Sequence, residues 1–314
     1  MNGHSLAIMV LCSHLCVGEG VKPLEPAEFT RFEERLTEKG ALPHEVLSLS
    51  FKDFMRVFDL PPDDAARIAQ LVKRCGSIVD EIEKYSSMGI FMLTKADTWY
   101  PGALKRKLGK SCPPIFYCAG NPELTNIRCA GFVGSRNVGA DDEAFTVATV
   151  GKVNDKGYSV VSGGARGIDS IASCASIANG SCCVEFVPDS LTSRIKRKAA
   201  VCAIAERRLL ILSAAIPDSR FFVGFAMMRN RYIYAQSEGT VIIKSDYNKG
   251  GTWNGAAYNL RQRLCNTFCW NNLDYEGNVE LIKRGAIPID ESWGGDLSGC
   301  DSGKAGAPEQ LSFF

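Results

Sequence analysis

Apolar side chains recur at helical spacing through the first part of the chain, residues 5–90. In the stretch EPAEFTRFEERLTEKG, for example, Phe29, Phe32 and Leu36 fall on one face before a glycine ends the pattern. Further along, LPPDD places prolines before an acidic first turn, which is typical of a helix start. The pattern predicts a small helical N-terminal domain over residues 1–88, without chemistry of its own.

The pattern changes near residue 129 to short apolar runs separated by helix-like stretches. The apolar, β-rich runs are CAGFVGSR, YSVVSG, CCVEFVP, RLLILSAAI, GTVIIKS and NTFCW. The helix-like stretches between them are 141–156, 168–179, 191–206, 221–237 and 253–264. Strands that are apolar throughout and alternate with helices predict a mainly parallel sheet covered on both faces. We therefore expect an α/β fold with a Rossmann-like, doubly wound domain over residues 89–290, whose ligands bind at the C-terminal ends of the strands.

The stretch SLAIMVLCSHLCVG near the N-terminus has no Lys or Arg before it and is interrupted by His14, so we expect a buried helix rather than a secretion signal. No apolar run approaches the ~20 residues that a membrane-spanning helix needs, and no membrane partner is expected. The 13 cysteines include no CxxC pair, and the 3 histidines all lie near the N-terminus. We expect no metal, no cofactor, and the reduced cytoplasm as the compartment.

Charge is distributed unevenly along the chain, although the formal net charge is only +1. Residues 1–90 hold 10 Lys and Arg against 14 Asp and Glu, and residues 290–314 hold 1 against 5. Both ends are therefore at −4, which leaves 25 against 16, or +9, for residues 91–289. A basic middle segment is a cue for an anionic partner. Its run RIKRK at 194–198 fits either that role or a solvated helix face.

The first strand of the sheet ends in VGSR, where Gly134 and Ser135 allow close backbone approach and Arg136 projects from the strand end. The motif is neither GxGxxG nor a GK[ST] loop, which excludes a dinucleotide fingerprint and a Walker A loop. Three acidic residues at 141–143 already satisfy the positive end of the following helix, which disfavours a phosphate there.

The second strand ends in VVSGGARGID. Gly163, Gly164 and Gly167 permit positive φ or close packing, and their N–H groups can form an anion nest. Arg166 adds a fork of donors that suits phosphate, and Asp169 can cap the next helix or orient Arg166. Taken alone, the turn fits a simple change of chain direction as well as a binding site.

Two later motifs are further candidates for the same binding site. In MMRNRYIYAQ, Arg229 and Arg231 flank Asn230 at an expected helix start. Because residues two apart point to different sides of a helix, we expect one arginine to face the strand ends while the other anchors internally. The motif KGGTWNGA follows the strand TVIIKS and opens another helix with three candidates: Gly250, Gly251 and Thr252. Four loops of this kind should converge on one crevice.

With these motifs in order, the chain resembles the DNA-processing protein A family over roughly residues 88–290. The lead-in GIFMLTKADTWYPGALKRKLGKSCPPIFYCAGNPEL, then FVGSR, VVSGGARGID, RNRYIYAQSEGTVIIKS and KGGTWNGA, and finally NVELIKRGAIPID match the family in sequence order. The resemblance implies a Rossmann-like domain that binds single-stranded DNA in a basic pocket without catalysis. It also implies loading of a RecA-type recombinase.

By motif, the resemblance assigns the pocket to the first two loops and places Arg229 and Arg231 near its rim. Together with the later motifs, the full set of candidate DNA or phosphate contacts is Gly134, Ser135, Arg136, Ser162, Gly163, Gly164, Ala165, Arg166, Gly167, Arg229, Asn230, Arg231, Gly250, Gly251 and Thr252. Binding by charge along the backbone makes affinity depend on salt.

A second function class stays open on the same core: a nucleotide-binding sensor or a nucleotide-processing protein. The related cytokinin-activating phosphoribohydrolases carry PGGxGTxxE with a catalytic glutamate. Here KGGTWNGA has Asn254 to Ala257 where an acid would be needed, so hydrolysis is disfavoured and nucleotide binding as a signal is not. We also expect a homodimer, although the sequence does not give the oligomeric state.

Residues 291–314 are rich in Gly and Ser, which predicts a disordered tail. The tail ends in QLSFF, which is similar to the pentapeptide by which bacterial replication proteins bind the sliding clamp. In that comparison Gln310 makes the polar contact while Leu311, Phe313 and Phe314 supply the apolar ones. The alternative is a tail that folds back on its own domain or packs in a dimer.

Overall fold

The computed structural model describes residues 2–18 and 20–298, and in this part nine strands form one sheet. Their spatial order is β1-β2-β6-β5-β4-β3-β7-β8-β9. The strands are β1 (Phe91–Thr94), β2 (Ile115–Gly120), β3 (Cys129–Val133), β4 (Ser159–Ser162), β5 (Cys183–Phe186), β6 (Leu209–Ser213), β7 (Gly239–Ile242), β8 (Asn266–Trp270) and β9 (Ile287–Ile289). The six apolar runs that the sequence analysis predicts as strands are β3 to β8.

The connections make the sheet doubly wound. From β3 the chain adds β4, β5 and β6 in one direction, then returns to place β7, β8 and β9 on the other side of β3. These seven strands are parallel, and only β2 runs antiparallel to its neighbours β1 and β6. The strand order therefore reverses between β3 and β7, which is where such folds bind ligands. The predicted α/β class is confirmed.

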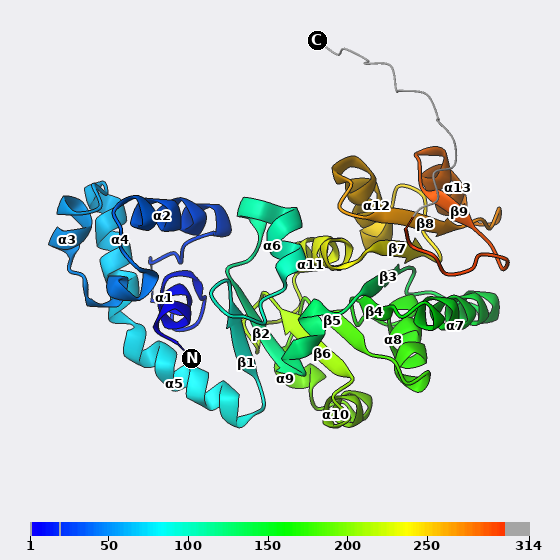
Figure 1. Ribbon diagram of the computed structural model, residues 1–314, viewed down its shortest axis with the longest axis horizontal. Coiled ribbons are helices and arrows are strands. Elements are labelled where there is room, and N and C mark those ends of the chain that lie inside the picture. The colour runs from blue at the N-terminus through cyan, green and yellow to red at the C-terminus, as the bar shows by residue number, and fades with distance from the viewer. Residues whose placement is uncertain (1, 19, 299–314) are drawn as a thin grey trace, which may run out of the picture.

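Helices cover both faces of the sheet (Figure 1), and each face has its own buried cluster. One face carries α7 (Ala140–Asp155), α8 (Ile168–Ala178) and α10 (Lys198–Ala205). The other carries α6 (Gly102–Leu108), α11 (Val223–Gln236), α12 (Gly250–Gln262) and α13 (Glu276–Lys283). Because every strand from β3 to β7 is buried on both faces, the runs have no polar alternation.

The N-terminal helices pack at one end of the elongated molecule (Figure 1). They are α1 (Gly3–Cys12), α2 (Pro26–Glu38), α3 (Phe51–Arg56), α4 (Pro62–Lys73) and α5 (Cys75–Ser87), with a 3-10 turn η1 (Pro43–Ser48). Helix α1 is buried along most of its length, which confirms the expected buried helix. In the described ranges no helix is long and apolar enough to cross a membrane.

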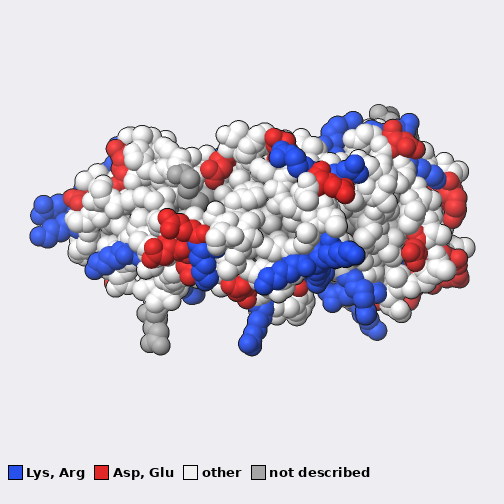
Figure 2. All heavy atoms as spheres, turned by 90° about the horizontal axis from the view of Figure 1, so that it is seen from below, with Lys and Arg blue, Asp and Glu red and all other residues white. Residues whose placement is uncertain are grey.

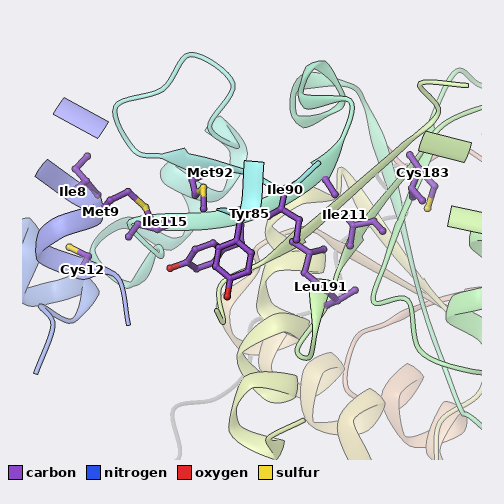
Figure 3. Close-up of a cluster of buried hydrophobic side chains, with 14 of the residues drawn as sticks. Ile8, Met9, Cys12, Tyr85, Ile90, Met92, Ile115, Cys183, Leu191 and Ile211 are labelled. Atoms are coloured by element: carbon purple, nitrogen blue, oxygen red, sulfur yellow. The ribbon is translucent and has the colours of Figure 1, made fainter. Parts of the chain in front are cut away.

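The helical part shares a core with the sheet. Figure 3 shows Met9 of α1 and Tyr85 of α5 beside Met92 of β1 and Ile115 of β2, all buried. Helix α5 ends at Ser87 and β1 begins three residues after the predicted boundary, so the expected division near residue 88 coincides with a change of element. The antiparallel pair β1 and β2 thus joins the helices to the parallel sheet.

Two features differ from the sequence-based expectations. The periodicity predicts no strand at β1, β2 or β9, and four- or three-residue strands such as β1 and β9 are too short to show one. The single helix expected over 191–206 is two helices, α9 (Leu191–Arg194) and α10, and Arg194 at the end of the first points inward. Its side chain is buried, pairs with Asp189 at 3.1 Å and donates to the carbonyl of Gly164. This part of the basic run is therefore structural.

Candidate functional site

A pocket of about 510 Å³ lies at the C-terminal ends of β3 and β7, where the strand order reverses. We call it the switch-point pocket. Its walls come from the loops after β3, β4 and β7, from α11, and from the first turn of α12. All four motifs that the sequence analysis singled out contribute to it, so the expected convergence of these loops is confirmed.

The pocket divides the candidate residues into two groups. Those that line it are Gly134, Ser135, Arg136, Ala165, Arg229, Asn230, Gly250, Gly251 and Thr252. Those that lie outside the lining are Ser162, Gly163, Gly164, Arg166, Gly167 and Arg231. The structure adds Asn137, Tyr234, Lys244, Asp246, Lys249 and Asn254 to the polar lining. Lys244 and Lys249 lie between β7 and α12. The sequence analysis already treats this segment as a loop at a strand end, so its position could have indicated both lysines as pocket residues.

Two glycines of the VVSGGARGID turn are required for close packing, and their contact with DNA stays a prediction. A Cβ on Gly163 would overlap the guanidinium of Arg229, and one on Gly167, at φ +88°, would overlap the backbone of the first loop. The hydroxyl of Ser162 donates to the carbonyl of Phe132 at 2.8 Å. The N–H of Ala165 donates to Asp169 at 3.3 Å, so this donor of the expected nest is engaged inside the protein.

Arg229 occupies the floor of the pocket. The sequence placed it at a helix start near the rim, but α11 begins at Val223, and Arg229 is 6% exposed in its second turn. Its Nη1 lies 3.5 Å from a carboxylate oxygen of Asp169, which is itself buried. Asp169 therefore orients Arg229, whereas the sequence analysis offered capping of the next helix or orientation of Arg166. Burial raises the pKa of Asp169, and the charge of Arg229 opposes that shift.

Arg231 lies on another side of α11, as the two-residue spacing predicts. It is exposed, and its guanidinium lies 4.6 Å from the ring centroid of Tyr258 in α12. Asn230, between the two arginines, donates to the carbonyl of Gly251 at 3.0 Å. Thus Arg229 is the internal anchor, while Asn230 and Arg231 hold α11 against α12.

Two buried donors in the pocket lack protein partners. The Nε of Arg229 and the hydroxyl of Tyr234 are both inaccessible and form no hydrogen bond among the described residues. An unpaired buried polar group costs about 1–3 kcal/mol, so such groups in a pocket indicate a ligand. Because a guanidinium N–H only donates and carries positive charge, that ligand should supply acceptor atoms and negative charge.

The first turn of α12 adds further donors. Its N-cap residue, Lys249, gives no side-chain cap, so the N–H groups of the first turn are not satisfied within the helix. The Thr252 hydroxyl donates to the carbonyl of Gly134 at 3.0 Å and holds this turn beside the first loop. A helix N-terminus with free N–H groups attracts anions. It faces the same pocket as the unpaired donors of Arg229 and Tyr234.

Positive charge at the pocket is only partly neutralised. Lys244 pairs with Asp142 at 3.0 Å, and Arg229 pairs with Asp169. Arg136 and Lys249 are exposed and form no ion pair in the part of the chain that the structure describes. Figure 2 shows that Lys and Arg side chains also gather near the middle of one face of the molecule.

The start of α7 is closed to anions by Asp142, as the sequence indicates. This carboxylate accepts from the N–H of Gly139 at 2.8 Å and from the hydroxyl of Tyr275 at 2.6 Å, besides its contact with Lys244. Burial alone would raise the pKa of Asp142, but these hydrogen bonds and the lysine outweigh it and lower the pKa. Asp142 thereby holds Lys244 beside the switch-point pocket.

Replacing Asp142 by asparagine is expected to lower the free energy of unfolding by about 2–4 kcal/mol at pH 7, because Lys244 and Tyr275 lose their charged acceptor. The carboxyl has a folded pKa below its unfolded value of about 3.9, so its contribution is present above that value and lost as the pH falls through the folded pKa. Urea unfolding at pH 7 and pH 3 should therefore show a smaller difference between the two proteins at pH 3. An equal difference at both values would contradict this.

Comparison with known proteins supports the same reading of the motifs. Residues 91–293 match the sequence family described as DNA recombination-mediator protein A. No curated protein matches the chain. DNA processing protein A from Streptococcus pneumoniae superposes with a TM-score of 0.62 at 19% identity, over 85% of this chain and 95% of that one. The Helicobacter pylori protein of the same name, whose structure addresses its single-stranded DNA binding mode, gives 0.53 at 25% identity, over 63% and 90%.

Proposed function

Because the chain belongs to the DNA recombination-mediator protein A family, we propose that it is a non-enzymatic protein that binds single-stranded DNA. The family gives the chain a DNA-processing role, and the expected resemblance is confirmed. In our proposal the backbone phosphates enter the switch-point pocket. The observation that carries it is the pair of buried, unpartnered donors, Arg229 Nε and the Tyr234 hydroxyl, at the pocket wall.

The donors suit a phosphodiester. Asp169 pairs with Arg229 at 3.5 Å and so fixes the position of its guanidinium at the pocket. Arg136 and Lys249 stand at the exposed edge, where they could follow the backbone to the neighbouring phosphates. The helix N-terminus of α12 adds backbone donors that carry no preference for a base. This arrangement supports binding that depends on charge and not on sequence.

Catalysis is not part of the proposal. The carboxylates at the pocket are Asp169, which is held by Arg229, and the exposed Asp246. Asn254 lines the pocket where the phosphoribohydrolase motif has its acid-containing end, and the three histidines of the chain are at positions 4, 14 and 44. The residues at the pocket thus orient and neutralise a phosphate, and we assign none of them as a general acid or base.

A free nucleotide is the second candidate ligand. The uncapped, glycine-rich start of α12 at the point of strand reversal is the arrangement by which many Rossmann-like proteins hold a nucleotide phosphate. The two candidates differ in a measurable way. A strand makes several phosphate contacts and gains affinity with length, whereas a mononucleotide makes its contacts within one pocket.

Binding of the wild-type protein to a labelled oligonucleotide is expected to weaken steeply between about 50 and 200 mM salt. With contacts from at least Arg136 and Lys249, the slope of log K against log salt should be about −1.4 or steeper for a single strand. Fluorescence anisotropy should show weaker binding to a duplex of the same sequence. A thermal-shift screen supplies the counter-test: stabilisation by a mononucleotide, with none by the oligonucleotide, would establish the nucleotide alternative instead.

The expected partners of the chain extend this proposal. We propose that it acts as a homodimer, loads a RecA-type recombinase, and binds the bacterial sliding clamp through QLSFF. The residues of that motif, Gln310 to Phe314, lie outside the described residues. A pull-down with sliding clamp, using the full chain and a chain truncated after Pro308, tests the last point. Equal capture with and without the tail would rule it out.

A further inference from the structure

A group of large apolar side chains is exposed beside the switch-point pocket. We call it the apolar platform, and its members are Phe221, Phe222, Val223, Phe225, Met227 and Met228. Phe222 and Val223 are 61% and 62% exposed, and Phe221 is 51% exposed. Single exposed apolar residues are ordinary, but six within eight consecutive positions are not. This grouping indicates a contact surface.

The platform exists because the two halves of α11 have different environments. In the second half, Tyr232, Ile233, Tyr234 and Ala235 are all buried against the sheet. The first half, together with Phe221 and Phe222 before it, projects from the molecule at the strand ends. Folding of the described chain therefore leaves these side chains without a partner.

The platform is continuous with the pocket. Phe221, Val223 and Met227 belong to both, because they line the switch-point pocket as well as the exposed surface. The guanidinium of Arg136 lies 5.9 Å from the ring centroid of Phe221. Phe222 and Phe225 form an edge-to-face pair with centroids 5.5 Å apart. An anion held by Arg136 would therefore have aromatic rings within a few ångströms of its attached groups.

We propose that the apolar platform stacks the bases of the single strand whose phosphates occupy the switch-point pocket. The inference rests on the proposed function. Phosphates and bases alternate along a single strand, and the molecule offers cationic donors and exposed π-faces side by side in the same way. Methionine sulfurs at 227 and 228 add polarisable contacts that adapt to any base. A duplex keeps its bases stacked on each other, so the platform selects single strands.

The choice of bases over a protein partner follows from the surrounding charge. The platform adjoins Arg136 and follows directly after Arg220, and both are exposed. Protein interfaces bury an apolar centre within a polar rim of both signs, whereas here the pocket donors point to a bound anion. A strand satisfies both features with one ligand. A second copy of the chain or another protein would have to bring its own anion into the pocket.

The test compares a thymidine oligonucleotide with an abasic oligonucleotide of equal length, which has the same phosphates and no bases. Wild-type protein should bind the thymidine strand more tightly. The variant Phe222→Ala/Phe225→Ala, which leaves the pocket-lining Phe221 in place, should lose about 10-fold or more of that affinity while its affinity for the abasic strand changes by less than about 2-fold. The Phe→Tyr double variant at the same positions, which retains the rings, should bind as wild type. Anisotropy at fixed salt gives both constants.

A matched control removes two exposed apolar side chains elsewhere, Leu42 and Val201, and should leave both affinities unchanged. Equal affinity of the alanine double variant and wild type for the thymidine strand would overturn the platform. An equal loss of affinity for both strands would also overturn it. So would a loss of affinity that sedimentation shows to result from a change in the oligomeric state of the variant. If wild type binds neither strand, the proposed function itself fails. Wild-type binding that ignores the bases overturns the stacking alone.

Discussion

Reversing two charges at the switch-point pocket, in the variant Arg136→Glu/Lys249→Glu, is expected to weaken single-stranded DNA binding by about 100-fold or more at low salt. Both side chains line the pocket, both are exposed, and neither is neutralised by a carboxylate in the described ranges. The variant should also flatten the slope of log K against log salt by about 1.4, because two phosphate contacts are lost. Since both residues are exposed, the melting temperature should change little.

The control carries the same change of charge at two exposed residues that do not line the pocket. Arg261 lies in the last turn of α12 and Lys105 in α6, and both are exposed. The variant Lys105→Glu/Arg261→Glu should keep most of the affinity and of the salt slope, because long-range charge effects are screened at ordinary ionic strength. An equal loss in both variants would mean that binding reflects overall charge and not the pocket.

Arg166→Glu refines the assignment of the second loop. Arg166 is exposed on the turn after β4, but it does not line the pocket. We expect a smaller loss of affinity than for Arg136→Glu, because Arg166 would contact the strand only beyond the pocket. Titration of both single variants with the same oligonucleotide decides this. A larger effect at Arg166 would place the phosphate in the turn itself.

Gly163→Ala is expected to lower the free energy of unfolding by about 3 kcal/mol or more, and to abolish most DNA binding. A methyl group at this position would overlap the Arg229 guanidinium, which is buried and tied to Asp169. If the arginine moves, the charge of Asp169 loses its partner in a buried site. Urea unfolding measures the first effect and anisotropy the second.

A double-mutant cycle separates this clash from a general intolerance of the turn. Arg229→Lys keeps a positive charge for Asp169 but removes the planar group that fills the space above Gly163. The cost of Gly163→Ala should fall markedly in that background. Gly151→Ala is the matched control, because Gly151 is inside α7 with nothing near its missing Cβ, so it should add about 0.5–1 kcal/mol. An unchanged cost of Gly163→Ala in the lysine background would contradict the packing role.

The parts of the fold that follow from local pattern are those with long, strongly biased segments. The apolar runs at β3 and β6 and the amphipathic stretches between strands are readable because both faces of each strand are buried. The run IFYCAG of β2 is apolar and buried like that of β3, so it has the same local signature, whereas the four residues of β1 are too few to show one. Which strands β1 and β2 pair with depends on residues far away in the sequence, and local pattern does not show it.

The residues of the site also divide into those that local pattern indicates and those that it does not. Glycine-rich loops after consecutive parallel strands must meet at one edge, so the sequence indicates a crevice and several of its residues, including Arg136 and Gly251. It does not indicate Tyr234, whose place depends on how α11 lies against the loops. Nor does the sequence show which glycines of the VVSGGARGID turn are required for packing, because glycines required for packing and glycines required for binding have the same local signature.

By itself the sequence determines the α/β class, the order of the motifs and the edge at which they meet, because hydrophobic periodicity and turn chemistry are local properties of a chain. Only the tertiary structure decides that Asp169 orients Arg229 rather than Arg166, and that the first half of α11 stays exposed. Those outcomes depend on which side chains become buried against each other when loops that are far apart in the sequence come together. Burial and charge pairing of that kind exist only once the chain has folded.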